Sequence, residues 1–123
     1  MDVRSITRIN HKVFPVIKVG KFWVHLQASD NNYCYPSIIS DKISDYEEVE
    51  VTIYHSEIDD NELNVRKMIP KPTWLKFFQD NHGWYIPINQ VQNIINDLEI
   101  RENSKALLLN EEETKKVLFW ESF

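Results

Sequence analysis

Cysteine and glycine are both scarce in this sequence. The 123-residue chain contains one cysteine, Cys34, and two glycines, Gly20 and Gly83. A single cysteine cannot form an intramolecular disulfide or a multi-cysteine zinc site. Two distant glycines also exclude a P-loop and a dinucleotide-binding fingerprint, because both motifs need several glycines close together so that the backbone can approach a phosphate. These absences remove the commonest nucleotide-dependent and zinc-dependent classes of protein.

Long hydrophobic runs are also absent. The first twenty residues intersperse Arg4, Arg8, Lys12 and Lys18 among apolar positions, whereas a secretory signal needs an unbroken apolar region of roughly 7–15 residues. No stretch approaches the ~18 apolar residues of a membrane span. Together with the unpaired Cys34, which suits a reducing compartment, this pattern predicts a cytoplasmic protein with no membrane association.

No arrangement of residues predicts catalysis or metal binding. The four histidines lack metal-ligand spacing, although His25 and His55 could meet across a sheet. Cys34 lies between two tyrosines and lacks the nearby cation or helix start that activates a thiol. The acidic run 59–62 lacks the register of a calcium loop, and no G-x-S-x-G nucleophile motif is present. We therefore expect no catalytic residue, no cofactor and no metal.

Strand patterns dominate the amino-terminal half. The runs Val13–Val19 and Phe22–Gln27 are separated by Gly20-Lys21, which predicts a hairpin with a type II′ turn. Tyr33–Ile39 reads as a third strand interrupted by a proline. Glu48–His55 alternates strictly between apolar and polar residues, which indicates a half-buried strand with an acidic face. Asn64–Ile69 is a candidate fifth strand.

Alternation in the strand 22–27 separates two faces. Phe22, Val24 and Leu26 share one face, and Trp23 and His25 share the other. If the aliphatic face lies in the core, Trp23 and His25 point outward. An exposed tryptophan suits an interface anchor, although a second layer packed on that face would bury it.

Helical patterns dominate the carboxy-terminal half. A helix is predicted from Pro72 or Thr73, where Trp74, Phe77 and Phe78 recur at helical spacing, and a brief strand covers 84–86. The clearest helix begins at Asn89, with Gln92 at the reciprocal capping position. Its apolar stripe is expected to pack on the strand residues Val49, Val51 and Ile53; the stripe comprises Val91, Ile94, Ile95 and Leu98.

A last helix is predicted to begin at Asn110. Three glutamates, 111–113, fill its first turn, where negative charge complements the helix dipole. Its apolar side contains Val117, Leu118 and Trp120. Strands followed by helices predict one α+β domain over residues 1–123. We expect an antiparallel sheet of about four to six strands, mostly in the amino-terminal half, packed by two or three carboxy-terminal helices.

Charge is distributed unevenly along the chain. The net charge is −5, but residues 1–25 carry +4, residues 40–64 carry −8 and residues 65–88 carry +3. A negative chain is a poor binder of phosphates, so we expect no direct nucleic-acid contact. The acidic segment has two interpretations. It is either a solvated edge that discourages strand pairing or a surface that complements a basic cleft on another protein.

The second interpretation predicts a set of partner-binding residues. Carboxylates on the outer side of the strand 48–55 and in the loop that follows would form a negative surface, and aromatic residues among them would supply rigid contacts. Trp23 would add an exposed anchor. The expected partner-binding residues are Glu48, Glu50, Tyr54, Glu57, Asp59, Asp60, Glu62, Tyr46 and Trp23.

In size, acidity and lack of catalytic motifs, the chain resembles the immunity proteins of bacterial toxin delivery systems. The resemblance is one of overall profile and covers no aligned stretch. It implies a small cytosolic binding protein that neutralises a basic partner, such as a nuclease-type toxin. The alternatives are a phage- or plasmid-encoded inhibitor, a structural or adaptor component of a larger complex, and an enzyme with an unfamiliar site.

Overall fold

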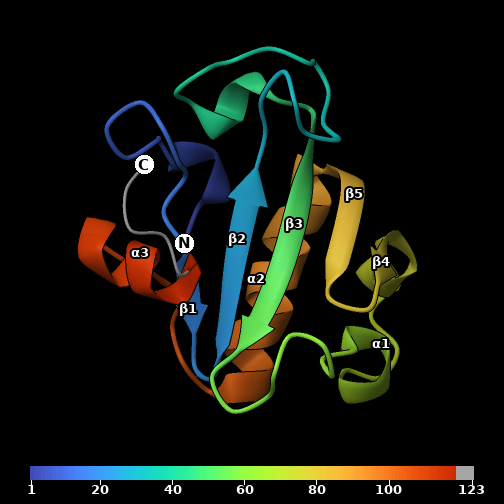
Figure 1. Ribbon diagram of the computed structural model, residues 1–123. Helices are drawn as coiled ribbons and strands as arrows, with labels where there is room; N and C mark the ends of the chain where they lie inside the picture. The colour runs from blue at the N-terminus through green and yellow to red at the C-terminus, as the bar shows by residue number, and fades with distance from the viewer. Residues whose placement is uncertain (119–123) are drawn as a thin grey trace.

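Six antiparallel strands form one sheet in the computed structural model, which describes residues 1–118 (Figure 1). The strand order is β4-β5-β3-β2-β1-β6, and the chain forms a single α+β domain as the sequence predicts. The strands are β1 (Ile17–Val19), β2 (Phe22–Gln27), β3 (Glu48–His55), β4 (Phe78–Gln79), β5 (His82–Pro87) and β6 (Leu107–Leu108).

Helices lie on both faces of this sheet. The long helix α2 (Ile88–Glu102) crosses behind it, and α3 (Glu111–Leu118) lies in front of β1 (Figure 1). A short helix α1 (Val65–Met68) and three 3-10 turns, η1 (Val3–Ser5), η2 (Ile43–Asp45) and η3 (Thr73–Phe77), complete the regular structure. None of the helices in this described part is long and apolar enough to span a membrane. We call the face under α2 the inner face and the opposite one the outer face.

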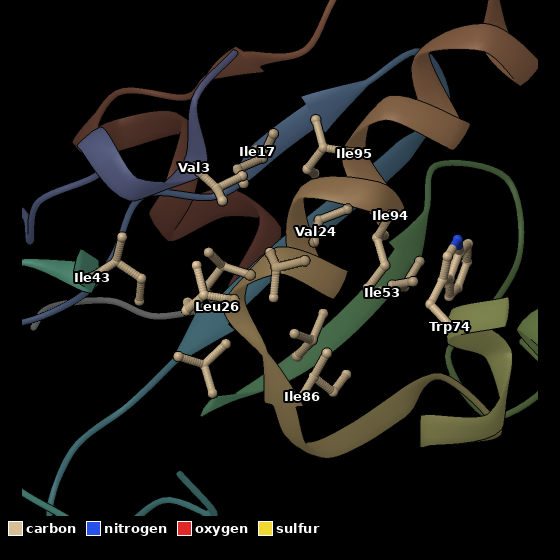
Figure 2. Close-up of a cluster of buried hydrophobic side chains, with 14 of the residues drawn as sticks. Val3, Ile17, Val24, Leu26, Ile43, Ile53, Trp74, Ile86, Ile94 and Ile95 are labelled. Carbon is tan, nitrogen blue, oxygen red and sulfur yellow. The ribbon is translucent and has the colours of Figure 1, made fainter. Parts of the chain in front are cut away.

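The inner face holds the core. The predicted stripe of α2 is fully buried in one cluster with the apolar residues of β3, which confirms the expected packing. Figure 2 shows Ile94 and Ile95 pointing from α2 toward the strands. Trp74 is buried beside them, and its indole Nε1 donates to Asp97 Oδ2 on α2 at 2.7 Å. This hydrogen bond fastens η3 to the helix.

The two helix starts differ in how well they were predicted. The predicted start of α3 at Asn110 is confirmed. A capping box closes it, because Asn110 Oδ1 accepts from the Glu113 amide at 2.9 Å and Glu113 Oε1 accepts from the Asn110 amide at 3.1 Å. The predicted Asn89 cap of α2 is wrong. That helix begins at Ile88 after Pro87, whose φ of −56° already suits a helix start. The expected position of Trp120 lies outside the described residues.

The Gly20 turn between β1 and β2 is confirmed, with Gly20 at φ +59°. β1 is shorter than predicted and covers only Ile17–Val19. Pro15 has no amide hydrogen, and the Val16 amide donates to Thr114 Oγ1 of α3 at 3.2 Å instead of to a strand. The residues before β1 therefore serve as an attachment for α3.

Three local predictions are wrong because neighbouring contacts decide the conformation. Tyr33–Ile39 is a loop with one bridge, Tyr35 to Glu48, since Pro36 stops the ladder there. Asn64–Ile69 contains the helix α1, in which the Asn64 side chain accepts the Arg66 amide at 3.1 Å. The helix predicted from 72 is the short turn η3, because Phe78 pairs with Gly83 and begins β4.

His25 was expected to point outward and is buried instead. The segment before β1 folds over this part of the outer face, so that Phe14 lies beside the imidazole. Burial lowers the pKa of His25 to about 4, and a hydrogen bond to the backbone of Phe14 opposes that shift only in part. His25 therefore belongs to a second buried layer on the outer face.

Candidate functional site

The outer face of the sheet carries a row of three side chains from adjacent strands. Lys18 of β1 pairs with Trp23 of β2, and Trp23 pairs with Tyr54 of β3. Neighbouring strands lie about 4.8 Å apart, so the row spans about 10 Å from Lys18 to Tyr54. Residues directly opposite one another in a ladder point to the same face. The order along the row is therefore a cation followed by two aromatic rings.

A cavity of about 800 Å³ lies over this row. Its walls come from α3, which contributes Lys116 and Val117, and from the loop after β3, which contributes Asp59 and Asp60. The volume lies within the range of roughly 300–1,000 Å³ that is usual for small-ligand pockets. The cavity is thus large enough to hold a small molecule or a side chain of another protein.

The two walls of the cavity differ in charge. Lys18 and Lys116 lie on the side of β1 and α3, and Asp59 and Asp60 lie on the side of the loop. Within residues 1–118, none of these four side chains forms an ion pair. A third carboxylate, Glu113, also lines the cavity, but its Oε1 accepts the Asn110 amide in the helix cap.

Two pKa shifts report the environment of the acidic wall. Partial burial raises the pKa of Asp60, the neighbouring Asp59 raises it further, and His82 lowers it. The pKa of Tyr54 is raised by burial and by the negative charge of Asp60. Asp60 therefore lies near both Tyr54 and His82.

A second feature of the outer face is a β-bulge in β5. Val49 pairs with Ile86 and Val51 pairs with Gly83, so β5 advances three residues where β3 advances two. Tyr85 lies in the bulge with φ +52°. Both Trp84 and Tyr85 remain exposed, at 38% and 48%. In a regular strand, consecutive side chains point to opposite faces, so the bulge is what keeps both rings out of the core.

Tyr33 completes an aromatic cluster around the bulge. Its ring centroid lies 6.3 Å from that of Trp84 and 6.0 Å from that of Tyr85, both edge-on, and its carbonyl accepts the Tyr85 amide at 3.1 Å. Trp84 also stacks on His82 at 6.5 Å. Glu50 Oε1 accepts the Tyr33 amide at 3.3 Å. We call Tyr33, His82, Trp84 and Tyr85 the aromatic cluster.

The aromatic cluster and the cavity adjoin each other. His82 lies opposite Thr52 on β3, with its Nδ1 3.1 Å from Thr52 Oγ1, and it is close enough to Asp60 to lower the pKa of that carboxyl. The outer face therefore carries a continuous band from Trp23 through Tyr54, Asp60 and His82 to the cluster.

Four of the nine predicted partner-binding residues meet at the cavity: Trp23, Tyr54, Asp59 and Asp60. Glu57 and Glu62 are exposed in the same loop. Lys21 Nζ lies 2.9 Å from Glu57 Oε1, and that ion pair lowers the pKa of Glu57. The negative charge of Glu57 is thus already compensated within the chain.

The other three predicted residues lie elsewhere. Glu48 and Glu50 are at the opposite end of β3, about 20 Å from the loop at ~3.3 Å per residue, and Glu50 is beside Tyr33. Tyr46 is buried; its hydroxyl donates to the Ile38 carbonyl at 2.7 Å and accepts the Ser40 amide at 2.9 Å. The acidic segment is therefore divided between the two ends of β3, and Tyr46 braces the loop before it.

The histidines and the cysteine do not come together. His25 pairs with Thr52, whereas His55 pairs with Phe22 and contacts its ring edge-on at 4.9 Å. Cys34 is buried, burial raises the pKa of its thiol, and its Sγ donates to the Ser29 carbonyl at 3.1 Å. No group of three or more metal-ligating side chains occurs among residues 1–118.

The aromatic cluster is the part of the site that the sequence analysis missed. One signal was available, because an isolated glycine inside a strand pattern often marks a bulge, and Gly83 is such a glycine. A Cβ on Gly83 would lie 2.5 Å from Ile86 Cδ1 and 3.1 Å from the Phe77 carbonyl oxygen. A larger residue here would force the Ile86 side chain and the end of η3 to move, which favours glycine at this position.

Comparison with known proteins adds no family to this description. A scan against protein-family models, a search of curated proteins and a search of solved structures each found no match for the chain.

Proposed function

We propose that this protein binds a basic protein partner through the outer face of its sheet. The observation that supports this best is the aromatic cluster, in which Trp84 and Tyr85 are both held in solvent by a bulge. Exposed apolar patches mark interaction sites, and aromatic residues are enriched at the centres of protein interfaces. A rigid tryptophan or tyrosine at the centre of an interface commonly contributes most of the binding energy.

Backbone strain supports a role in binding. A left-handed conformation costs a residue other than glycine roughly 1–2 kcal/mol, and Tyr85 adopts it at φ +52°. Strained residues of this kind concentrate at functional sites, where the conformation serves a purpose other than stability. Here the strain places a second aromatic ring beside Trp84 and Tyr33.

The charges around the aromatic cluster favour a partner with a positively charged surface. Glu48 and Glu50 lie on one side of the aromatic cluster, and Asp60 lies on the other side next to His82. A negative rim around an aromatic centre attracts a positive surface, speeds encounter and selects among partners. The proposed partner is a toxin of the nuclease type, whose phosphate-binding cleft presents Lys and Arg. An inhibitor encoded by a phage or plasmid would use the same chemistry.

The test uses the product of the gene next to this one as the candidate partner. Binding is measured by isothermal titration calorimetry with the parent chain, Tyr33→Ala, Trp84→Ala and Tyr35→Ala. Tyr35 is the matched control, since it is as exposed as Tyr33, at 56%, and lies outside the cluster. Loss of a central aromatic side chain should weaken Kd about 30-fold or more, as expected for a hot-spot residue. Equal effects of Tyr33→Ala and Tyr35→Ala would place the interface elsewhere.

The charge of the rim is tested separately. Glu48→Gln with Asp60→Asn should slow association, and the slowing should fade as salt rises from 50 to 300 mM, because screening removes steering beyond a Debye length of about 8 Å. Asp30→Asn with Glu112→Gln removes the same charge from exposed positions outside the band. If this control slows association as much, the effect comes from net charge and the acidic rim has no special role.

A second candidate function is an adaptor that assembles with copies of itself. The observation that favours it is the edge strand β6, where Leu107 and Leu108 are both exposed. An open edge with apolar side chains invites pairing with another strand. Sedimentation equilibrium of the parent chain and of Leu107→Lys distinguishes the two functions: a dimer lost on substitution supports the adaptor, and a monomer in both cases opposes it.

A further inference from the structure

The cavity on the outer face carries opposite charges at its two ends, and the proposed protein–protein contact does not account for its positive end. Along the row of strands, positive charge from Lys18 lies at one end, Trp23 and Tyr54 form the floor, and negative charge from Asp59 and Asp60 lies at the other end. A single cation or a single anion would satisfy only one wall. The arrangement suits a ligand that carries both charges with an apolar centre between them.

We propose that this cavity binds a small zwitterion whose ammonium and carboxylate lie about 10 Å apart, such as a short peptide with free ends. Three residues of extended chain span about 10 Å, which matches the distance of about 10 Å along the row from Lys18 on β1 to Tyr54 on β3. This site adjoins the aromatic cluster and shares Asp60 with the acidic rim of the proposed interface, but the inference does not rest on the proposed function.

The acidic wall provides the site for the ammonium group. Asp59 and Asp60 are adjacent and form no ion pair within the described chain. Asp60 is close enough to Tyr54 for its charge to raise the pKa of that hydroxyl. Carboxylates and an aromatic face together favour a cation, through charge and through cation–π attraction. Partial burial and the neighbouring Asp59 raise the pKa of Asp60, and a bound ammonium would offset both effects by favouring the charged carboxylate.

The basic wall provides the site for the carboxylate. Lys18 comes from β1 and Lys116 from α3, so two different elements bring these ammonium groups to the same side of the cavity. Neither lysine is ion-paired within residues 1–118. The position of α3 is fixed by its capping box and by the hydrogen bond from Val16 to Thr114. The backbone that carries this wall is therefore in position without a ligand.

The centre of the cavity is suited to an apolar side chain. Trp23 is half-buried in the floor, and Val117 and Ile58 line the sides. A half-buried tryptophan presents a large rigid surface on which an aromatic or aliphatic group can pack. We therefore expect a hydrophobic middle residue to strengthen binding.

The probe for the experiment is the tripeptide Gly-Phe-Gly with free ends. Three analogues serve as comparisons: an acetylated amino end, an amidated carboxyl end, and both blocks together. Binding is measured by calorimetry and by the shift of the Trp23 indole NH resonance in NMR spectra. We expect each single block to weaken binding about 10-fold, as for loss of one charged hydrogen bond. The double block should remove binding.

Variants assign each end of the peptide to its wall. Asp60→Asn should abolish the preference for a free amino end, and Lys18→Met should abolish the preference for a free carboxyl end. The matched controls are Asp30→Asn and Lys105→Met, which remove the same charges from exposed positions away from the cavity. Circular dichroism melts check that every variant remains folded.

Three outcomes would overturn the inference. These are no binding of the free tripeptide at about 10 mM, equal binding of the blocked and free peptides, or equal effects of the cavity variants and their controls. Trp84→Ala should leave tripeptide binding unchanged while weakening the protein partner, so failure of either proposal is recognisable without the other. Saturating Gly-Phe-Gly that displaces the protein partner would show that the two ligands share the outer face.

Discussion

The two faces of the sheet differ in how their side chains are buried. On the inner face, apolar residues of β2, β3 and α2 are excluded from water in one continuous cluster. On the outer face, polar and aromatic residues are covered only in places, by the amino-terminal segment over His25 and by α3 beside Lys18. The comparison shows that alternation decides which residues enter the main core. Covering segments then decide which of the remaining residues stay available to a ligand.

The largest expected effect is on the inner face. Ile95→Ala should lower the free energy of unfolding by about 2–5 kcal/mol, because it leaves a cavity in the packed cluster. Ile100→Ala is the control on the same helix, since Ile100 is 81% exposed, and it should change stability by no more than about 0.5 kcal/mol. Urea unfolding followed by circular dichroism measures both. Similar values for the two variants would mean that α2 does not pack through the predicted stripe.

The second effect concerns the one histidine buried on the outer face. The pKa of His25 is about 4 in the folded chain and 6.5 in its ordinary state. Between these values the unfolded chain binds a proton that the folded chain excludes, so stability falls as pH falls from about 6.5 to about 4, by up to about 3 kcal/mol. The contribution of His25 is fully present above pH 6.5.

Unfolding free energies of the parent and of His25→Gln, measured from pH 7.5 to pH 4, test this expectation. Other groups titrate in the same range, so the informative quantity is the difference between the two curves. The variant should lose less stability than the parent on acidification. Parallel curves would show that the folded chain takes up a proton at His25 as readily as the unfolded chain does.

The third effect distinguishes strain from packing at the bulge. Tyr85→Gly relieves a left-handed conformation worth roughly 1–2 kcal/mol at an entropic cost of about 0.5–1 kcal/mol. We expect the free energy of unfolding to rise by about 0.5–1 kcal/mol while affinity for the protein partner falls. Opposite signs in stability and affinity would identify Tyr85 as a residue kept for binding. A loss of stability would instead assign its ring a packing role against Tyr33.

The smallest effect is expected at the acidic wall of the cavity. Asp60 is exposed, and Asp60→Asn should change the free energy of unfolding by no more than about 0.5 kcal/mol at pH 7. The direction should be stabilising, because the raised pKa of Asp60 means that its charged form is disfavoured in the fold. A thermal melt of the two proteins in the same buffer is sufficient. A large destabilisation would make Asp60 a structural residue and would weaken its assignment to a ligand.

Much of the inner half of the fold could be predicted from the sequence. β2, β3 and the stripe of α2 follow from alternation and helical spacing, and the start of α3 follows from its local capping residues. These features depend on neighbours in the sequence or on one continuous apolar face. Such information is contained in a short window of residues.

The parts that could not be predicted depend on distant residues. His25 is buried because the segment before β1 crosses it, and Phe78 is drawn from a helix into β4 by pairing with Gly83. The cavity requires α3 to lie beside a row from three strands, and the aromatic cluster requires Tyr33 to reach Trp84. None of these contacts has a local sequence pattern, although Gly83 was a signal from which an irregular strand could have been predicted.

The attachment of α3 to residues before β1 also bears on how the chain reaches its fold. Val16 and Thr114 are 98 positions apart, and the Val3 amide donates to Gln92 Oε1 across 89 positions at 2.9 Å. Contacts of such separation close late and slow the folding of small domains toward the millisecond-to-second range. During synthesis, the hairpin β1–β2 and strand β3 emerge long before α2 and α3. The apolar face of the nascent sheet therefore stays uncovered until α2 has been synthesised. During that interval chaperone binding or aggregation competes with folding.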